Sequence, residues 1–107
     1  LGSKKQRHAL QMALTVKQRD QQIVVVDTLQ VEVAKTKEVA KMLADLGLEG
    51  KTLIYDSSSN EGLARAARNL PGVSVSQDFG LNVYDLLLHD WLLISREGIE
   101  RLSEVLQ

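Results

Sequence analysis

The sequence predicts a single small α/β domain over residues 1–107, with a four-stranded parallel sheet that has helices on both faces. Apolar runs such as Ile23-Val24-Val25-Val26 lack polar alternation, a pattern typical of buried strands in parallel sheets. Segments of helical periodicity separate these runs, so successive strands are joined by right-handed crossovers and not by hairpins. A length of 107 residues with 44% hydrophobic residues suits one domain near the small end of this class.

The first predicted element is a helix over residues 4–19. This stretch contains no glycine or proline, and Leu10, Ala13 and Leu14 recur at helical spacing. After this helix, we expect the strands at residues 22–27, 51–55, 73–76 and 91–95.

Helices are predicted between the strands and after the last one. Residues 34–46 place Val39, Leu43 and Leu46 on one apolar stripe, and Gly47 provides a stop. Three more helices are predicted: one carrying Leu63 to Leu70, one from the N-cap Asn82 through Leu88, and one from the N-cap Ser95 with Ile99, Leu102 and Leu106 as its buried stripe.

Composition excludes several classes of site. A chain without cysteine has no disulfide, thiolate nucleophile or zinc finger. His8 and His89 are the only histidines and have no acid at a ligand spacing, so we expect no metal and no cofactor. The apolar runs are far shorter than the roughly 20 residues that cross a bilayer, and no charged-then-apolar leader precedes them. We therefore expect neither a membrane span nor a signal peptide.

Asp27 and Asp56 are the candidate catalytic residues, because each follows a predicted strand and parallel sheets bind ligands at the carboxyl ends of their strands. Neither strand leads into a glycine-rich phosphate loop, and neither aspartate has a second acid beside it. His89 and Asp90 resemble an oriented imidazole, but adjacent side chains on an extended segment point to opposite faces, so we expect a surface turn. We predict no catalytic residue; the alternative is a small phosphate- or nucleotide-binding domain that uses Asp27, Asp56 and residues 57–60.

Charge is distributed unevenly along a chain whose net charge is −1. The first 20 residues have a net charge of +4, and the remainder has −5. The charged residues of this first part are Lys4, Lys5, Arg7, Lys17, Arg19 and Asp20. Local clusters set the field that a phosphate experiences, so the basic end is a candidate site for a polyanion. A solvated helix end is the alternative of equal weight.

A second candidate patch combines two segments. Arg65, Arg68 and Asn69 lie at i, i+3 and i+4 and therefore share one face of a predicted helix. Lys35 and Lys37 lie near the start of the predicted helix over 34–46. These side chains could contact phosphates, although spacing alone favours a solvated face.

Several segments together resemble the large-subunit ribosomal protein L-four family. They occur in the order and spacing of that family and cover essentially the whole chain: Lys4–Leu10, Ala13-Leu14, Ile23–Asp27, Lys35-Thr36-Lys37, Leu46-Gly47-Leu48, Ala66–Pro71 and Gly80–Leu86. The most diagnostic segments are Ala66-Ala67-Arg68-Asn69 and the stretch that begins Gly80-Leu81-Asn82-Val83-Tyr84.

The resemblance implies a primary rRNA-binding protein of the large ribosomal subunit, of which this chain is the C-terminal half without a long basic loop that reaches the exit tunnel. It requires no catalytic residue, cofactor or metal. The RNA-binding residues that we expect are Lys4, Lys5, Arg7, His8, Lys17, Lys35, Lys37, Arg65, Arg68 and Asn69. The implied partners are large-subunit rRNA, neighbouring ribosomal proteins and, in a regulatory role, messenger RNA. The implied location is the ribosome, in a bacterial-type cytoplasm, a mitochondrion or a plastid.

Overall fold

The strands form one parallel sheet in a computed structural model that describes residues 4–27, 29, 36–56, 61–77 and 83–106. Its order is β1-β4-β2-β3. The strands are β1 (Ile23–Val26), β2 (Thr52–Asp56), β3 (Val73–Gln77) and β4 (Trp91–Ser95). Each overlaps the range predicted for it, and every pair of neighbours is parallel, so the predicted fold class is confirmed.

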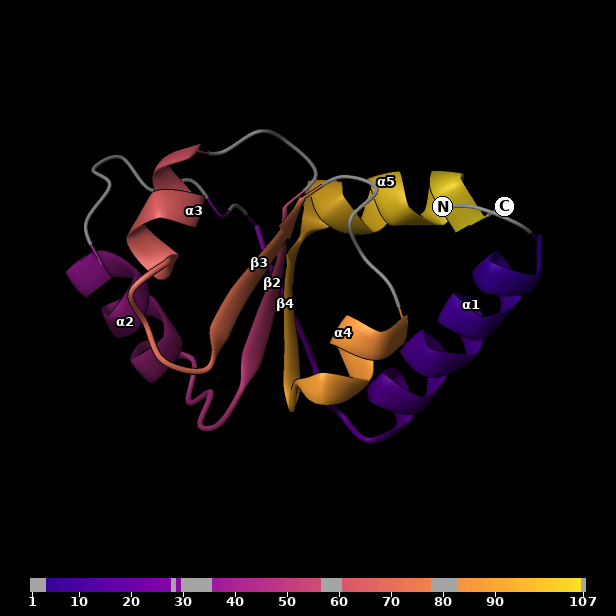
Figure 1. The fold of residues 1–107 in the computed structure, drawn as a ribbon, viewed down its shortest axis with the longest axis horizontal. Helices are drawn as coiled ribbons and strands as arrows, with labels where there is room; N and C mark the ends of the chain where they lie inside the picture. The colour runs from indigo at the N-terminus through magenta and orange to yellow at the C-terminus, as the bar shows by residue number, and fades with distance from the viewer. Residues whose placement is uncertain (1–3, 28, 30–35, 57–60, 78–82, 107) are drawn as a thin grey trace.

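The helices lie in two layers, one on each face of this sheet (Figure 1). They are α1 (Lys4–Arg19), α2 (Thr36–Asp45), α3 (Glu61–Ala67), α4 (Val83–Leu88) and α5 (Arg96–Leu106). The α2 and α3 helices cover one face, and α1, α4 and α5 cover the other. The chain therefore crosses one face twice on its way from β1 to β3, and it returns across the other face to insert β4 between β1 and β2.

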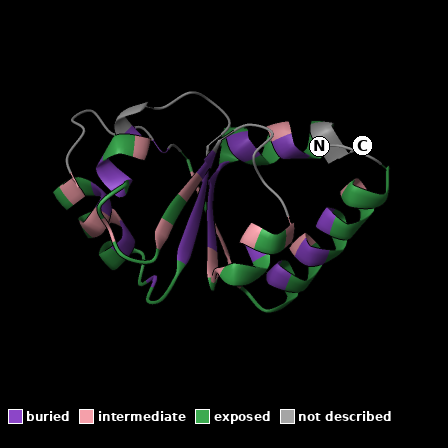
Figure 2. Cartoon of the chain, viewed as in Figure 1, coloured by how far each residue is buried: buried purple, intermediate pink, exposed green. Residues whose placement is uncertain are grey.

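Alternate residues of the central strands point into two separate cores, as the period of a strand requires. On β4, Leu92 and Ile94 face the α1, α4 and α5 layer, whereas Leu93 faces α2 and α3. On β2, Tyr55 likewise faces the α1, α4 and α5 layer, and Ile54 faces α2 and α3. Figure 2 shows these strands as buried and the outer sides of the helices as exposed. A strand that is buried on both faces has apolar side chains on both sides, so polar and apolar residues do not alternate along it. This is why continuous apolar runs in the sequence predicted buried strands.

Three residues that the sequence predicts to be buried are exposed. Val25 is 47% exposed, Leu46 37% and Ile99 36%. Leu46 lies beyond the last residue of α2 and so falls outside the stripe that the helix buries. Among the strands that the structure describes, β1 pairs with β4 alone and is an edge strand, so Val25 is not enclosed as residues of the central strands are. Ile99 of α5 lies near the same open edge.

Candidate nucleic-acid interface

The first turns of α1 carry exposed cations. Lys4, Lys5 and His8 are exposed, and Arg7 is half-buried. The first turn contains no acidic residue, although the partial positive charge at a helix N-terminus favours acids there and disfavours cations. Among the residues that the structure describes, no carboxylate forms an ion pair with Lys4 or Lys5. This charge distribution favours an anion supplied from outside the chain.

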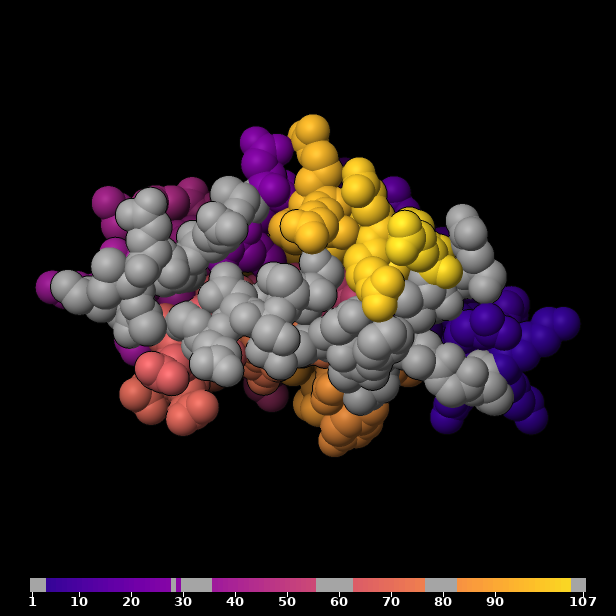
Figure 3. All heavy atoms as spheres, turned by 90° about the horizontal axis from the view of Figure 1, so that it is seen from above, coloured from indigo at the N-terminus to yellow at the C-terminus, as the bar shows by residue number. Residues whose placement is uncertain are grey.

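The middle of α1 anchors the helix and leaves its basic end projecting. Leu10 and Ala13 are buried in the core, one to three turns beyond the cations. Lys4 and Arg7 lie on the same face of the helix, whereas Lys5 projects from another side. Figure 3, a view from above, shows the first residues of α1 at one end of the molecule. The basic end can therefore approach a polyanion without displacing the core.

Lys17 differs from the other basic residues of α1, because it is only 6% exposed. Its Nζ donates a hydrogen bond to the backbone carbonyl of His89, in the turn between α4 and β4. This contact gives Lys17 an internal role that the sequence analysis missed, and its expected contact with RNA remains a prediction. The signal was present in the sequence, because Lys17 continues the buried spacing of Leu10 and Ala13.

His89 lies in the turn before β4, as expected, but it is half-buried and its side chain and backbone contact three other elements. Its Nδ1 lies 2.6 Å from the carbonyl oxygen of Asp85, and its Nε2 lies 3.1 Å from the hydroxyl of Ser74. A carbonyl only accepts, so Nδ1 carries the proton and, in the neutral ring, Nε2 accepts from Ser74. Asp90 points elsewhere, because its Oδ2 accepts the backbone N–H of Lys51 at 3.0 Å. The pair is therefore structural, and Asp90 does not orient the imidazole.

The second predicted patch is exposed but lies partly beyond a helix end. Arg65 is the last basic residue of α3, whereas Arg68 and Asn69 follow in the turn after Ala67. The side chains of Arg65, Arg68 and Asn69 are all exposed, which argues against an internal role for Arg68. Lys37 on α2 is also exposed. Lys41 lies one turn later on the same side of α2, is exposed as well, and adds a second positive charge to this side.

Two other residues that bear on this patch lie outside the described ranges. Lys35 is one of them, and Asp78, a candidate internal partner of Arg68, is the other. Lys41 is a cation that the sequence analysis missed, although its i+4 spacing from Lys37 was visible in the sequence.

The structure separates the two candidate patches. The α1 patch lies on one face of the sheet, and the patch on α2 and α3 lies on the opposite face, as Figure 1 shows. The molecule measures 39 Å along its longest axis. The two patches therefore lie on opposite faces of the sheet and do not form one continuous surface.

The alternative site at the strand ends has little to hold a phosphate. The carboxylate of Asp27 pairs with Arg96 Nη2 at 3.2 Å, and both side chains are exposed. Asp27 and Asp56 end strands that are separated by β4, and the Asp56 side chain and residues 57–60 lie outside the described part. The nearby start of α5 is capped internally, because Ser95 Oγ accepts the N–H of Gly98 at 2.9 Å. Its first turn also carries Glu97, whose charge opposes an anion at this helix end.

In the part of the chain that the structure describes, no three His, Cys, Asp or Glu side chains gather closely enough to hold a metal ion. Within the same described ranges, no helix combines the length and apolar character that crossing a membrane requires.

Comparison with known proteins identifies the family. The model of the Ribosomal protein L4/L1 family matches residues 1–105. A relative from Moorella thermoacetica, named large ribosomal subunit protein uL4, is 42% identical over 106 residues, which are 99% of this chain and 51% of the relative. Proteins of the same name from Heliobacterium modesticaldum and Natranaerobius thermophilus are 40% and 37% identical over 105 residues, which are 98% of this chain and 51% of each relative.

The matches cover this chain far more completely than they cover the relatives. The chain spans about half the length of the curated relatives it matches. The family model nevertheless covers nearly all of the chain, from residue 1 to residue 105, and the identities lie well above the level of chance similarity. The chain belongs to the Ribosomal protein L4/L1 family.

Proposed function

We propose that this chain is an rRNA-binding part of the large ribosomal subunit, and that the first turns of α1 contact RNA phosphates. The observation that carries the proposal is the exposed pair of cations Lys4 and Lys5, which lie beside the half-buried Arg7 and the exposed His8. Family membership and the printed name of the relatives, which are large ribosomal subunit proteins, support the same conclusion.

The physical reason is the cost of placing cations at a helix N-terminus. A cation in the first turn is repelled by the helix dipole by roughly 0.3–1 kcal/mol at an exposed site. A bound phosphate reverses the sign of this interaction, because it is attracted by both the cationic side chains and the partial positive charge of the helix N-terminus. Lys4, Lys5 and Arg7 then neutralise phosphates and release condensed counterions. This binding positions the chain on folded RNA without reading a base sequence.

The role is structural and needs no chemistry from the protein. Neighbouring ribosomal proteins and a regulatory messenger RNA are further partners under this proposal, and the ribosome is the place of action. Lys37 and Arg65 belong to a secondary RNA contact on the opposite face of the sheet. The nucleotide-binding alternative is not favoured, because the start of α5 is capped internally by Ser95 and carries Glu97.

A salt series tests the proposal. In filter binding to large-subunit rRNA fragments, replacing Lys4, Lys5 and Arg7 by Ala is expected to flatten the slope of log affinity against log salt by about 2–3. The matched control replaces three other exposed bases by Ala, with the same change in net charge: Arg19, Lys51 and Arg96. The control should leave the slope unchanged. Equal slopes for the wild type and the α1 variant would show that the basic end is only a solvated surface.

A further inference from the structure

One side of α1 carries a stripe of exposed residues that is apolar in the middle and charged at both ends. Five residues at spacings of three or four share this side, and we call them the α1 stripe: Lys5, Ala9, Met12, Val16 and Asp20. The helical hydrogen bonding extends to the last of them, because the N–H of Asp20 donates to the carbonyl of Val16 at 3.0 Å. The stripe therefore runs the whole length of α1.

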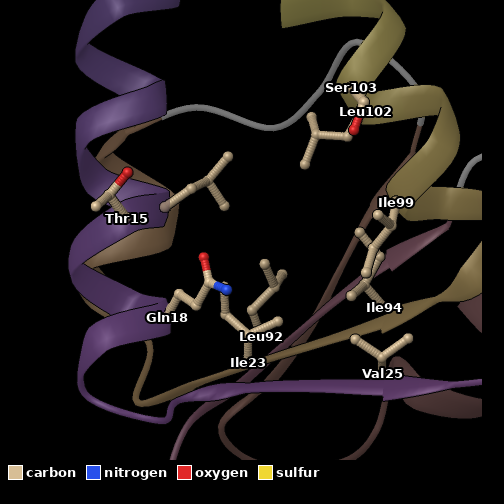
Figure 4. A pocket seen from close by; sticks show the side chains of 10 residues that line it. Thr15, Gln18, Ile23, Val25, Leu92, Ile94, Ile99, Leu102 and Ser103 are labelled. Atoms are coloured by element: carbon tan, nitrogen blue, oxygen red, sulfur yellow. The ribbon is translucent and has the colours of Figure 1, made fainter.

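The α1 stripe lies apart from the sides of the helix that pack within the domain. Leu10, Ala13 and Lys17 are the buried residues of α1. Gln18 points toward the hollow between α1 and α5, as Figure 4 shows, and Leu14 lines the same hollow. At 100° per residue, the stripe falls on the flank of α1 that is opposite to this hollow.

The neighbouring helix α4 adds more exposed apolar surface. It contacts α1, and Lys17 bonds to the turn that follows it, so α4 lies beside the second half of α1 (Figure 1). On α4, Tyr84, Leu87 and Leu88 lie at i, i+3 and i+4, and the first two are 72% and 62% exposed. Of the eight large apolar side chains that are exposed in the described ranges, five lie on α1 and α4. Such a concentration marks an interaction surface.

The charges at the two ends of the α1 stripe have opposite signs. Lys5 lies in the first turn, where no carboxylate of the described residues forms an ion pair with it. At the other end, Asp20 pairs with Arg19 at 3.3 Å, and both side chains are exposed. An exposed pair of this kind contributes little to stability, so Asp20 can accept another cation. When two copies of α1 pack antiparallel about a two-fold axis, each Lys5 meets the Asp20 of the other copy.

The apolar middle of the stripe is complementary to itself in the same arrangement. The midpoint between Lys5 and Asp20 falls beside Met12, so the register that joins the charged ends places the axis at this residue. Ale-sized and branched side chains then face each other, because Ala9 lies opposite the partner's Val16. A small residue opposite a larger one allows close packing, and the flexible methionine adapts to its own copy across the axis.

We propose that the α1 stripe is the interface of a two-fold dimer of this chain, in which the two α1 helices pack antiparallel and α4 flanks the contact. Packing along one helix pair is smaller than a standard interface, so the dimer is reversible and forms at high protein concentration. It does not depend on RNA. Because the dimer covers Lys5, a polyanion that contacts Lys5 competes with the second copy.

Sedimentation equilibrium of this chain without RNA, over concentrations from micromolar to hundreds of micromolar, measures the association. We expect a monomer–dimer equilibrium. Met12→Lys should weaken it by about tenfold or more, because it brings two like charges together at the axis. Leu46→Lys is the matched control: Leu46 is an exposed apolar residue in the layer on the other face of the sheet, and the change in charge is the same. The control should associate as the wild type does.

Charge reversal tests the antiparallel register. Lys5→Glu brings two acids together at each end of the stripe, and Asp20→Lys brings two bases together, so each variant alone should dimerise about fivefold more weakly or worse at low salt. An equal mixture of the two variants restores opposite charges at both ends and should form a heterodimer about as tightly as the wild type dimerises. Both changes suit the helix dipole, so the variants should remain folded, which circular dichroism checks.

Four results would overturn the proposal. A chain that stays monomeric over the whole series would assign the stripe to a different partner. Association that Met12→Lys leaves intact, or that Leu46→Lys abolishes, would place the contact elsewhere on the molecule. A mixture of Lys5→Glu and Asp20→Lys that associates no better than either variant alone would exclude the antiparallel register.

Discussion

Replacing Lys17 by methionine removes a buried ammonium from α1 while keeping a side chain of similar length. The wild-type Nζ donates to the carbonyl of His89, and Lys17 is 6% exposed. A hydrogen bond from a charged donor contributes about 1.5–3 kcal/mol, and the orphaned carbonyl adds a desolvation cost of about 1–3 kcal/mol. The substitution also removes the desolvation cost of a buried ammonium, and this gain offsets part of the loss. We expect Lys17→Met to lower the free energy of unfolding by about 1–2 kcal/mol, which is the balance of these opposing effects.

Thermal and urea unfolding measure this loss. In a domain of this size, about 1 kcal/mol corresponds to a decrease in Tm of roughly 4–8 °C. Lys17→Ala should lose about 2 kcal/mol more than Lys17→Met, because it also removes the buried atoms beyond Cβ that methionine keeps, and each of these is comparable in burial to a methylene group. Gln18→Met is the matched control: it changes an exposed neighbour and should shift stability by less than about 0.5 kcal/mol.

RNA binding separates the structural role of Lys17 from the role expected from the sequence. An ammonium that is committed to the His89 carbonyl releases no counterion, so Lys17→Met should leave the salt dependence of RNA affinity unchanged. A Lys17→Met variant that keeps wild-type stability and flattens the salt slope by about 1, the signature of a phosphate contact, would refute this structural role.

Two further predictions concern the turn before β2 and the second patch. Gly50→Ala should destabilise the fold by about 2 kcal/mol, because Gly50 has φ +104° and a Cβ there would lie 2.5 Å from Asp90 Oδ2, displacing the bond to Lys51. Gly47→Ala, with φ +71° and open space around it, should cost only about 1 kcal/mol in the same urea titration, and equal losses would contradict the role of Asp90. Arg68→Lys should leave Tm unchanged, since the side chain is exposed, and should weaken rRNA binding severalfold through loss of the guanidinium fork. A lower Tm with unchanged binding would instead reveal an internal role for Arg68.

The local pattern of apolar and polar residues was sufficient to predict the helices and strands of this fold. The absence of glycine and proline from residues 4–19, with the spacing of Leu10, Ala13 and Leu14, predicted α1, and each predicted strand overlaps the observed one. These features depend on residues close together in the chain, whose periodicity shows which side is buried. The parallel arrangement could be predicted as well, because single helices between strands leave few other connections. The cationic end of α1 was visible for the same reason, as a cluster of neighbours in sequence.

The sequence alone therefore specifies the fold class, the elements and the basic segment, whereas the order of the strands emerges only from tertiary packing. Insertion of β4 beside β1 pairs Ile23 with Leu92, residues far apart in the chain, and no local window contains that contact. This order makes β1 an edge strand and exposes Val25. The packing of α1 against the α4–β4 turn likewise buries Lys17 at the His89 carbonyl. Such contacts arise between distant surfaces after the elements have formed, so they depend on packing that periodicity does not encode.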